Sequence, residues 1–440
     1  MMKVRMIGLE RSFSKMRFFG ILTLFLFLFS SVFGAEKKAA AAPKSHGKGL
    51  PIKFYYKDGL KWKTDDGNFS GHIGGRIMWD MFWGREPKNM NTVFGEFRDG
   101  TEFRRTRFFM SGKVYKNISY KLQFDWAGGK VSLKDAYIAF HFPNLEKLLN
   151  LKVGHFKRPQ GLEESGTSSK YITFIERSLA NAFAPGRDAG IMIYGHPHAM
   201  LGYALGFFKQ VPNSGKMQDE GDYSFTGRVY LSPMADKKKG RALHVGFSYS
   251  FTPNVNNTGN YTIHSKPEAH LAPTIYSTGN LGTQGNTDAN IAGFEFATVF
   301  GPFSLQGEYF WALLDTPIGF SKDPSISGYY VYVSFFVTGE HRSYSAKKGG
   351  FGRVHPKKNF LQDGGFGALE VALRFSAIDL DSRAIGNKAD GYDITFGVNW
   401  YLTPNVRFMM NYVYGWKAGK TAGAGGGSYD ILLTRFQIDF

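Results

Sequence analysis

The sequence predicts an all-β protein, a closed antiparallel barrel of sixteen strands that crosses a membrane. Apolar and polar residues alternate through most of the chain after residue 68, which is the period of a β-strand with one apolar face. Several alternating runs extend over nine to twelve residues, a length that crosses a bilayer at a tilt. Tight turns such as 116–117 and 403–404 alternate with long connections such as 253–290 and 339–365. In outer-membrane barrels the tight turns lie at one end and the long loops at the other.

The amino-terminal residues 1–34 are predicted to be a signal peptide. Five basic residues precede the apolar stretch FFGILTLFLFLFSSVFGA, which ends in small residues, and this order is typical of secretory leaders. The stretch is short for a bilayer span, which disfavours a retained membrane anchor. Residues 35–68, which open with the low-complexity run EKKAAAAPKSHGKGLP, are predicted to be a periplasmic linker or coil.

The barrel domain is predicted over residues 69–440. In the run 118–126 the apolar face carries Ile118 and Leu122, and the polar face carries Lys121. The final run places Phe436 and Phe440 on one apolar face, which we expect to contact lipid. We expect strands to begin near residues 69, 101, 118, 131, 149, 188, 200, 222, 241, 291, 303, 326, 364, 391, 405 and 429. Sixteen strands leave an aqueous lumen, whereas a soluble propeller would show a blade-length repeat.

Composition excludes several classes of function. The formal net charge is +18, and removal of a 34-residue leader with five basic residues and one acid leaves about 18 − 4 = +14. The absence of cysteine excludes a disulfide framework. No nucleic-acid module, phosphate-binding loop or zinc-ligand spacing accompanies the charge, so we expect no nucleic-acid partner, no metal and no cofactor. Ser168, His155 and Asp188 could form a nucleophilic triad only if the fold brought them together.

Four segments of the chain resemble one known family. They are Phe103–Asp125, Gly154–Ile191, Ser327–Tyr344 and Ile394–Gly415. These segments are similar, in the same order, to the phosphate-selective porins O and P, and the similarity extends from about residue 69 to the end of the chain. The resemblance implies a sixteen-stranded outer-membrane barrel, a homotrimer and a third loop folded inward to narrow the pore. It also implies that the terminal Phe440 is read by the outer-membrane assembly machinery.

The run EFRRTRF contains the first candidate anion-binding residues. On a strand, Arg105 and Arg107 share one face, and Arg104 takes the opposite face beside Phe108 and Met110. Arg105 and Arg107 are therefore predicted to project into the lumen, with Arg104 near the rim. Guanidinium groups offer forked donors to oxyanions. The resemblance implies that Arg104 and Arg105 match a paired position in an arginine ladder that guides phosphate, although solvated rim residues would look the same.

The predicted third loop, residues 158–187, contains the second candidate site. The resemblance implies that Ser168 and Ser169, followed by Lys170, match the serines of a central anion site. The family's lysine falls at Glu164 or Ser165. An acid at this place would repel phosphate, which favours a less selective pore. Ordinary turn chemistry would also explain the two serines.

A third group of basic residues lies in the run HRSYSAKKGGFGRVHPKK, and in the family such lysines collect anions at the mouth. Its members are Arg342, Lys347, Lys348, Arg353, Lys357 and Lys358. A merely solvated basic loop is the alternative. Arg374 is predicted to face the lumen with Glu370, whereas the long connection NYTIHSKPEAHLAP has no arginine, so the arginine ladder looks incomplete.

Together these features predict an outer-membrane porin through which small anions, with phosphate or polyphosphate as candidates, diffuse passively. Rings of Arg and Lys are how pores favour anions. A general-diffusion pore with weak selectivity is the first alternative. An outer-membrane barrel enzyme and an adhesive barrel with a closed lumen are less favoured. The expected partners are small inorganic anions, outer-membrane lipid, the assembly machinery and two further copies of the chain.

Overall fold

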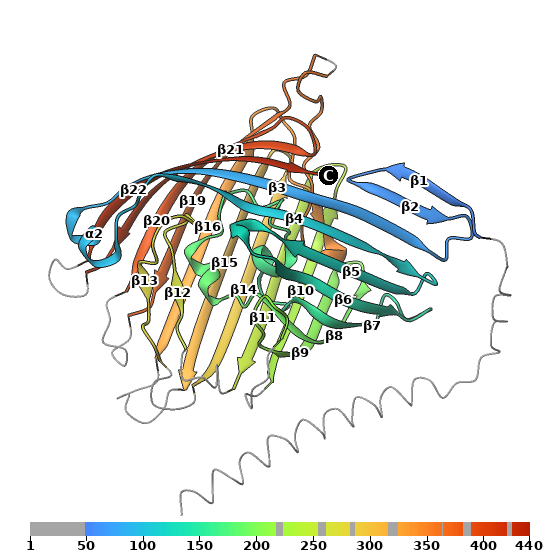
Figure 1. Ribbon diagram of the computed structural model, residues 1–440, viewed down its shortest axis with the longest axis horizontal. Helices are drawn as coiled ribbons and strands as arrows, with labels where there is room; N and C mark the ends of the chain where they lie inside the picture. The colour runs from blue at the N-terminus through green and yellow to red at the C-terminus, as the bar shows by residue number, and fades with distance from the viewer. Residues whose placement is uncertain are drawn as a thin grey trace, which may run out of the picture. The chain divides into compact units, whose positions relative to one another are not determined.

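The computed structural model describes residues 49–216, 223–253, 261–281, 287–315, 324–362, 364–381, 389–419 and 425–440. The predicted signal peptide, and the part of the predicted linker before residue 49, lie outside the described residues. From Pro51 onward the chain forms one unit. Antiparallel strands make up most of this unit (Figure 1).

Sixteen antiparallel strands close into a barrel, because the last strand pairs with the first barrel strand. In chain order they are β3 (Ser70–Arg85), β4 (Gly100–Val114), β5 (Ile118–Asp125), β6 (Ser132–His141), β7 (Asn150–Lys157), β8 (Arg187–His198), β9 (Leu201–Lys209), β10 (Ser224–Asp236), β11 (Arg241–Thr252), β14 (Asp288–Phe300), β15 (Phe303–Asp315), β16 (Ser325–Phe336), β19 (Ala368–Asp379), β20 (Gly391–Tyr401), β21 (Val406–Lys417) and β22 (Gly427–Asp439). The predicted fold class is confirmed, and each predicted start lies within four residues of the observed one.

The remaining elements are short and lie in the connections. They are the helix α2 (Lys88–Phe94), the single turns η1 (Ala127–Gly129), η2 (Gly161–Gly166), η3 (Leu179–Phe183) and η4 (Ala346–Lys348), and the paired two-residue strands β12 (His264–Ser265) with β13 (Tyr276–Ser277) and β17 (Tyr344–Ser345) with β18 (Gly350–Phe351). Among the described residues, no helix is long and apolar enough to cross a membrane.

The barrel wall is apolar outside and polar inside, and β22 illustrates the rule. Phe436, Ile438 and Phe440 are 50%, 42% and 41% exposed, whereas Arg435 and Gln437 are buried toward the interior. The predicted outward face of the final strand is therefore confirmed. Strands of a transmembrane barrel alternate in this way because one face meets lipid and the other meets the lumen.

A hairpin precedes the barrel, where the sequence analysis expected coil. Strands β1 (Ile52–Tyr56) and β2 (Leu60–Thr64) pair with each other, and β2 continues onto the first residues of β3. The physical reason is the length of β3. Strand β22 covers β3 only from Arg76 onward, so the edge at residues 70–73 is free to accept another strand.

The connection between β16 and β19, residues 337–367, lies at the barrel end that carries the tight turns. The prediction that this connection lies with the long loops, at the other end of the barrel, was wrong. Consecutive strands alternate in direction, so every second connection returns to the same end. The turn between β14 and β15 and the one between β20 and β21 share that end with the β16–β19 segment, as we call residues 337–367.

Within the described residues, three connections run through the barrel interior and contact one another or the opposite wall. In the first, residues 158–186 (the β7–β8 segment), the Ile175 amide donates to the Asn411 side chain of β21 at 2.7 Å. The second, described over residues 261–281 (the β11–β14 segment), places Glu268 against Arg374 of β19. The β16–β19 segment is the third, and its Phe351 amide donates to Thr167 at 3.2 Å. The sequence analysis expected only the first.

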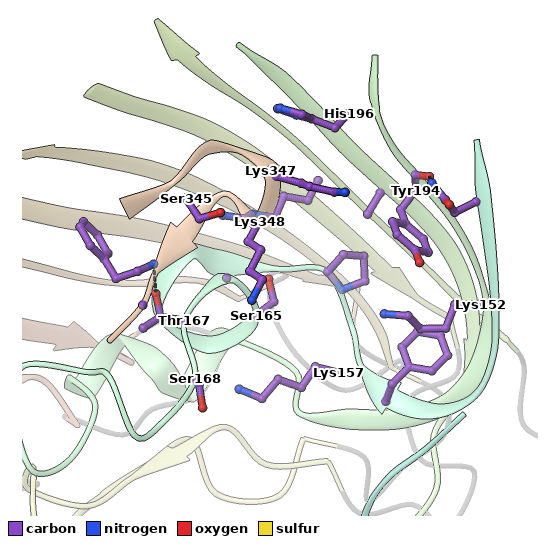
Figure 2. Close-up of a pocket in the computed structure, with 18 of the residues that line it drawn as sticks. Lys152, Lys157, Ser165, Thr167, Ser168, Tyr194, His196, Ser345, Lys347 and Lys348 are labelled. Carbon is purple, nitrogen blue, oxygen red and sulfur yellow. Dashed lines mark hydrogen bonds between the residues drawn. The ribbon is translucent and has the colours of Figure 1, made fainter. Parts of the chain in front are cut away.

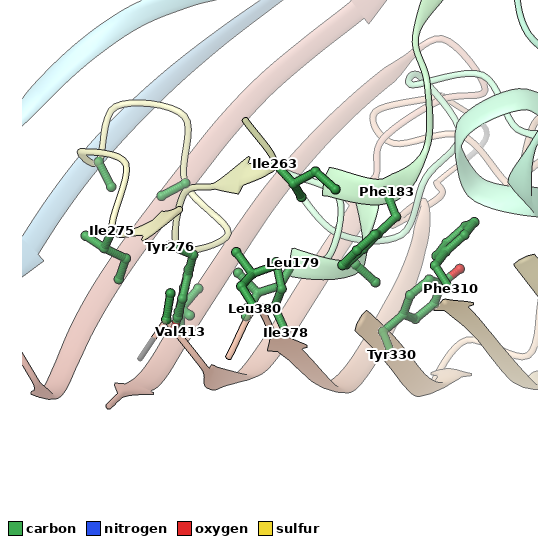
Figure 3. Close-up of a cluster of buried hydrophobic side chains, with 14 of the residues drawn as sticks. Leu179, Phe183, Ile263, Ile275, Tyr276, Phe310, Tyr330, Ile378, Leu380 and Val413 are labelled. Carbon is green, nitrogen blue, oxygen red and sulfur yellow. The ribbon is translucent and has the colours of Figure 1, made fainter. Parts of the chain in front are cut away.

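Apolar side chains of the inner segments fill the side of the lumen that is lined by β14 to β22. Leu179 and Phe183 of the β7–β8 segment lie in one cluster with Ile263 and Tyr276 of the β11–β14 segment (Figure 3). The wall contributes buried residues such as Phe310. Dispersion contacts and removal of apolar area from water stabilise these segments inside the barrel. Open space is thus left on the opposite side, near β3 to β10.

Substitution of Gly75 by alanine is expected to lower the stability of the closed barrel by about 1–3 kcal/mol, because overpacking forces backbone shifts. Gly75 exchanges backbone hydrogen bonds with Phe440 at 2.7 and 3.2 Å. An added Cβ would lie 2.6 Å from the Arg107 carbonyl oxygen and 2.7 Å from the Phe440 ring. Thermal unfolding in detergent measures the effect. Gly186→Ala is the matched control, since its Cβ would meet nothing within 4 Å, and an equal loss there would contradict the explanation.

Candidate functional site

A cavity of about 1380 Å³ lies between the β7–β8 segment, the β16–β19 segment and the inner faces of strands β3 to β10. Its lining is strongly cationic, with thirteen Lys and Arg against three Asp and Glu. The basic residues are Arg76, Arg107, Lys113, Lys121, Lys147, Lys152, Lys157, Arg187, Arg228, Lys237, Lys347, Lys348 and Arg353. A water-filled space bounded by one sign of charge concentrates ions of the opposite sign.

Arg76 of β3 connects the barrel wall to the two serines that the sequence analysis singled out. Its Nη1 donates to Ser169 Oγ at 2.9 Å and to Ser168 Oγ at 3.3 Å. Within the described residues, Arg76 forms no ion pair with a carboxylate. Both hydroxyls and the guanidinium line the cavity. A guanidinium has five N–H donors, so Arg76 can bind an oxyanion in addition to the serines.

Glu164, which the sequence analysis expected to repel anions, is neutralised by its neighbours. Lys157 Nζ and Arg177 Nε each lie 2.9 Å from its carboxylate. Although burial raises the pKa of Glu164, the charges of Arg177 and Lys157 outweigh it and lower the pKa to about 2. Glu164 is therefore ionised at neutral pH, and its charge is balanced by two cations.

Arg104 and Arg105 both bind a carboxylate of the β7–β8 segment. Arg104 Nε donates to Glu176 at 2.9 Å, and Arg105 Nη1 lies 3.8 Å from the same carboxylate. Arg105 is buried inside, as predicted, but the rim position predicted for Arg104 was wrong. Met78 pairs with Arg105 and Trp79 with Phe103, so Arg104 forms a bulge that has no partner on β3. A bulge changes the direction of the side chain, and Arg104 turns toward Glu176. Neither arginine lines the cavity.

Two other predicted residues, Arg107 and Lys121, reach the cavity already paired. Arg107 of β4 binds Asp125 at 2.7 Å. Lys121 of β5 and Arg187 of β8 share Asp135 at 2.5 and 2.7 Å. These cations face the cavity with much of their charge compensated, so they attract anions less strongly than an unpaired cation would.

The basic run of the β16–β19 segment is divided by the fold. Lys347 and Lys348 line the cavity (Figure 2), and within the described residues neither forms an ion pair. Lys357 and Lys358 are exposed and do not line it. The segment turns inward after Arg342, whose guanidinium lies 3.5 Å from the centroid of the Phe351 ring, and this turn separates the two lysine pairs.

Lys170, Arg353 and Arg374 are held by long-range ion pairs. Lys170 lies 2.7 Å from Asp439, and Arg353 binds the same carboxylate at 3.2 Å. Of these three, only Arg353 lines the large cavity. Arg374 and Glu370 both face inward, as predicted, but Arg374 is bound by Glu268 at 3.0 Å. The long connection without arginines thus supplies an acid to the interior.

Several cavity residues were missed by the sequence analysis. Arg76, Lys113, Lys152 and Arg228 lie on strands and face inward. Strand alternation could have found Lys113, because it has the same parity as Arg105 on β4. The same alternation could have found Arg228, because Phe225, Val229 and Leu231 take the opposite face of β10. It could also have found Lys152, which lies between Leu151 and Val153 on β7. The run around Arg76 gives a weaker signal, because Met78 and Phe82 share its face of β3.

The structure separates the three residues of the hypothetical triad. Ser168 accepts from Arg76, His155 Nδ1 contacts the Lys134 carbonyl at 2.7 Å, and Asp188 accepts from Arg158 at 3.4 Å. Nucleophilic catalysis needs direct contact between nucleophile and base. In the part of the chain that the structure describes, no group of three His, Cys, Asp or Glu residues could hold a metal ion.

A closed sixteen-stranded barrel with an apolar outer face and a cationic cavity defines an outer-membrane porin, a channel rather than an enzyme. The chain belongs to the phosphate-selective porin O and P family, whose model matches residues 72–440. Membership of this family assigns the protein to the bacterial outer membrane.

Two relatives are similar over most of their length. Porin O of Pseudomonas aeruginosa is 29% identical over 434 residues, which cover 89% of this chain and 93% of that protein. An uncharacterized protein of Caulobacter vibrioides is 26% identical over 389 residues, which cover 85% of this chain and 73% of the relative.

Solved structures show the same fold at low sequence identity. The anion-selective porin from Comamonas acidovorans is 13% identical, with a TM-score of 0.54, and the match covers 84% of this chain and 100% of that structure. The outer-membrane channel DcaP of Acinetobacter baumannii is 10% identical, with a TM-score of 0.52 over 86% of this chain and 99% of that structure.

Proposed function

We propose that this porin lets small anions diffuse passively across the outer membrane and that phosphate is a favoured one. The observation that carries the proposal is Arg76, which forms no ion pair with any described carboxylate and donates to Ser168 and Ser169 beside a cavity lined mainly by basic side chains. Guanidinium and hydroxyl donors suit a tetrahedral oxyanion. The naming of the family and of the Comamonas structure after phosphate and anions supports the proposal.

The proposed mechanism is electrostatic and needs no cofactor. An anion that enters the cavity exchanges part of its hydration shell for the donors of Arg76, Ser168 and Ser169. Lys347 and Lys348 line the cavity where the β16–β19 segment bounds it, and their charges lower the electrostatic energy of an anion there. Conduction requires weak binding at several places rather than tight binding at one, and the compensated charges of Arg107, Lys121 and Arg187 keep binding weak.

Further parts of the proposal concern export and assembly. The leader at residues 1–34 directs the chain out of the cytoplasm, and the outward face of β22 contacts lipid. Three copies form a homotrimer, and the assembly machinery reads Phe440. Family membership supports assembly into oligomers.

A general-diffusion pore is the second candidate function. It is favoured by the ion pairs of Arg107 with Asp125 and of Arg374 with Glu268, and by Glu176, which Arg104 and Arg105 share. These carboxylates offset much of the positive charge along their part of the lumen.

Replacement of Arg76 by glutamine is expected to weaken block of the channel by phosphate about fivefold, since removal of one cation near 4 Å in water costs about 1 kcal/mol. The measurement is the phosphate concentration that halves the potassium chloride current of the purified protein in a planar bilayer, together with the zero-current potential under a potassium chloride gradient. Arg98→Gln is the control, because Arg98 is exposed, does not line the cavity and pairs with the exposed Glu96. A wild-type potential near zero, with no phosphate block, would support the general-diffusion pore instead.

A further inference from the structure

Lys152 of β7 lies in the cavity wall among three aromatic rings. Its Nζ is 4.8 Å from the ring centroid of Tyr137, 5.1 Å from that of Phe156 and 5.0 Å from that of Tyr194. The rings come from β6, β7 and β8, three neighbouring strands. Figure 2 shows Lys152 beside Tyr194 at the edge of the cavity, with Lys348 on the opposite side. Ring faces attract an ammonium group and hold it in place.

The hydrogen-bond donors of this cluster have no acceptor partner among the described residues. Among the described residues, Lys152 forms no ion pair with a carboxylate, in contrast to Lys121 and Lys157 in the same cavity. The hydroxyls of Tyr137 and Tyr194 likewise have no hydrogen-bond partner within the described part of the chain. All three side chains are half-buried and line the cavity, so their donors are open to a ligand there. An ammonium and two phenol hydroxyls are together suited to an anionic group with several oxygen acceptors.

The same part of the wall presents apolar surface to the cavity. Phe156, Met192, Tyr203 and Pro159 line it together with the two tyrosines of the cluster. Phe156 is 3% exposed and packs edge-on against Tyr137, with centroids 6.0 Å apart, so it supports the tyrosine ring from behind. Inorganic phosphate has no apolar part that could use such a surface. Ligand sites commonly combine apolar and aromatic lining with a few convergent polar groups.

We propose that Lys152, Tyr137, Phe156 and Tyr194 form a subsite for organic anions that carry one carboxylate or phosphate-monoester group on a flat apolar body. The ammonium and the two hydroxyls bind the anionic group, and the ring of the ligand packs against the half-buried rings of Tyr137 and Tyr194, which Phe156 supports. The subsite lies on the wall of β6 to β8, whereas Arg76 and its two serines lie on β3 and the β7–β8 segment. The inference rests on the proposed function as an anion channel, and it adds organic anions to the ions that the channel would carry.

The test compares how well four anions block the potassium chloride current of the purified protein in a planar bilayer. Phenyl phosphate, inorganic phosphate, benzoate and acetate are added in separate titrations. Phenyl phosphate is expected to block at about five- to tenfold lower concentration than inorganic phosphate, because an aromatic pair contributes roughly 0.5–1.5 kcal/mol. Stronger block by benzoate than by acetate would show that a carboxylate serves as well as a phosphate monoester.

Variants assign the effect to the subsite. In Lys152→Met and in Tyr194→Leu, phenyl phosphate and inorganic phosphate are expected to block at about the same concentration, so that the ratio of their blocking concentrations falls to about one. Lys113→Met is the matched control, because Lys113 lines the same cavity but contacts no aromatic ring in the described structure, and it should keep the ratio. Heat-modifiable migration on a gel confirms that each variant forms a barrel.

The outcomes separate this inference from the proposed function. Equal block by phenyl phosphate and inorganic phosphate in the wild type overturns the subsite, and so does a ratio that survives in both Lys152→Met and Tyr194→Leu. Loss of anion selectivity in the zero-current potential would instead overturn the proposed function. A preference for phenyl phosphate that disappears only in the two subsite variants supports the inference.

Discussion

Replacement of Asp80 by alanine is expected to destabilise the barrel by about 3 kcal/mol, the lower end of the range for removing one partner of a buried ion pair. Arg435 of β22 and Asp80 of β3 face each other across the seam that closes the barrel. Two hydrogen bonds of 2.7 Å join them, and Arg435 is fully buried. Glu176 still contacts Arg435 at 2.8 Å, which is why the loss falls at the lower end.

Urea-induced unfolding in lipid vesicles measures this loss as a change in the free energy of unfolding. Asp65→Ala is the matched control, since Asp65 pairs with Lys53 on the exposed hairpin at 3.0 Å. Exposed pairs contribute about 0–1 kcal/mol, so this variant should stay close to the wild type. Similar losses in the two variants would mean that the seam pair contributes no more than a surface pair.

Replacement of Lys347 and Lys348 by serine is expected to reduce the preference for anions over cations about tenfold or more, because each unpaired charge near the ion path contributes about 1 kcal/mol at 4 Å in water. Both lysines line the cavity, and within the described residues no carboxylate pairs with them. The zero-current potential under a salt gradient measures the ratio of anion to cation permeability. The effect should shrink at high salt, since the Debye length falls to about 3 Å at 1 M.

The double replacement of Lys357 and Lys358 by serine provides the control on the same segment. These two lysines are exposed outside the cavity, so the selectivity should change little. The two double variants have the same net charge, which removes any effect of overall charge on the measurement. If both double variants lost selectivity equally, the long-range field of the segment would matter rather than its position in the cavity.

The strands could be predicted from the sequence because the signal is local. In β22 the outward Phe436 and Ile438 alternate with the inward Arg435 and Gln437, and this period is a property of neighbouring residues alone. The hairpin β1–β2 was missed for the opposite reason. Its existence depends on the free edge of β3, and an edge is a property of the assembled sheet.

The face of a side chain could be predicted only where the strand was regular. Arg105 faces inward as its position in the alternation requires, but the bulge beside Arg104 turns that residue toward Glu176. A bulge shifts the alternation by one residue, and nothing in the run EFRRTRF indicates where the partner strand will require it.

The sequence by itself determined a closed barrel with an apolar outer face, an excess of basic residues and candidate anion-binding residues on several strands. Only the tertiary structure decided which of these cations face the cavity without a counter-charge. Lys170 is paired with Asp439 and Arg374 with Glu268, across separations of 269 and 106 residues. Arg76 and Lys152 were left without a carboxylate partner among the described residues. Charge compensation depends on distance in space, and the inward segments bring together acids and bases that no local pattern connects.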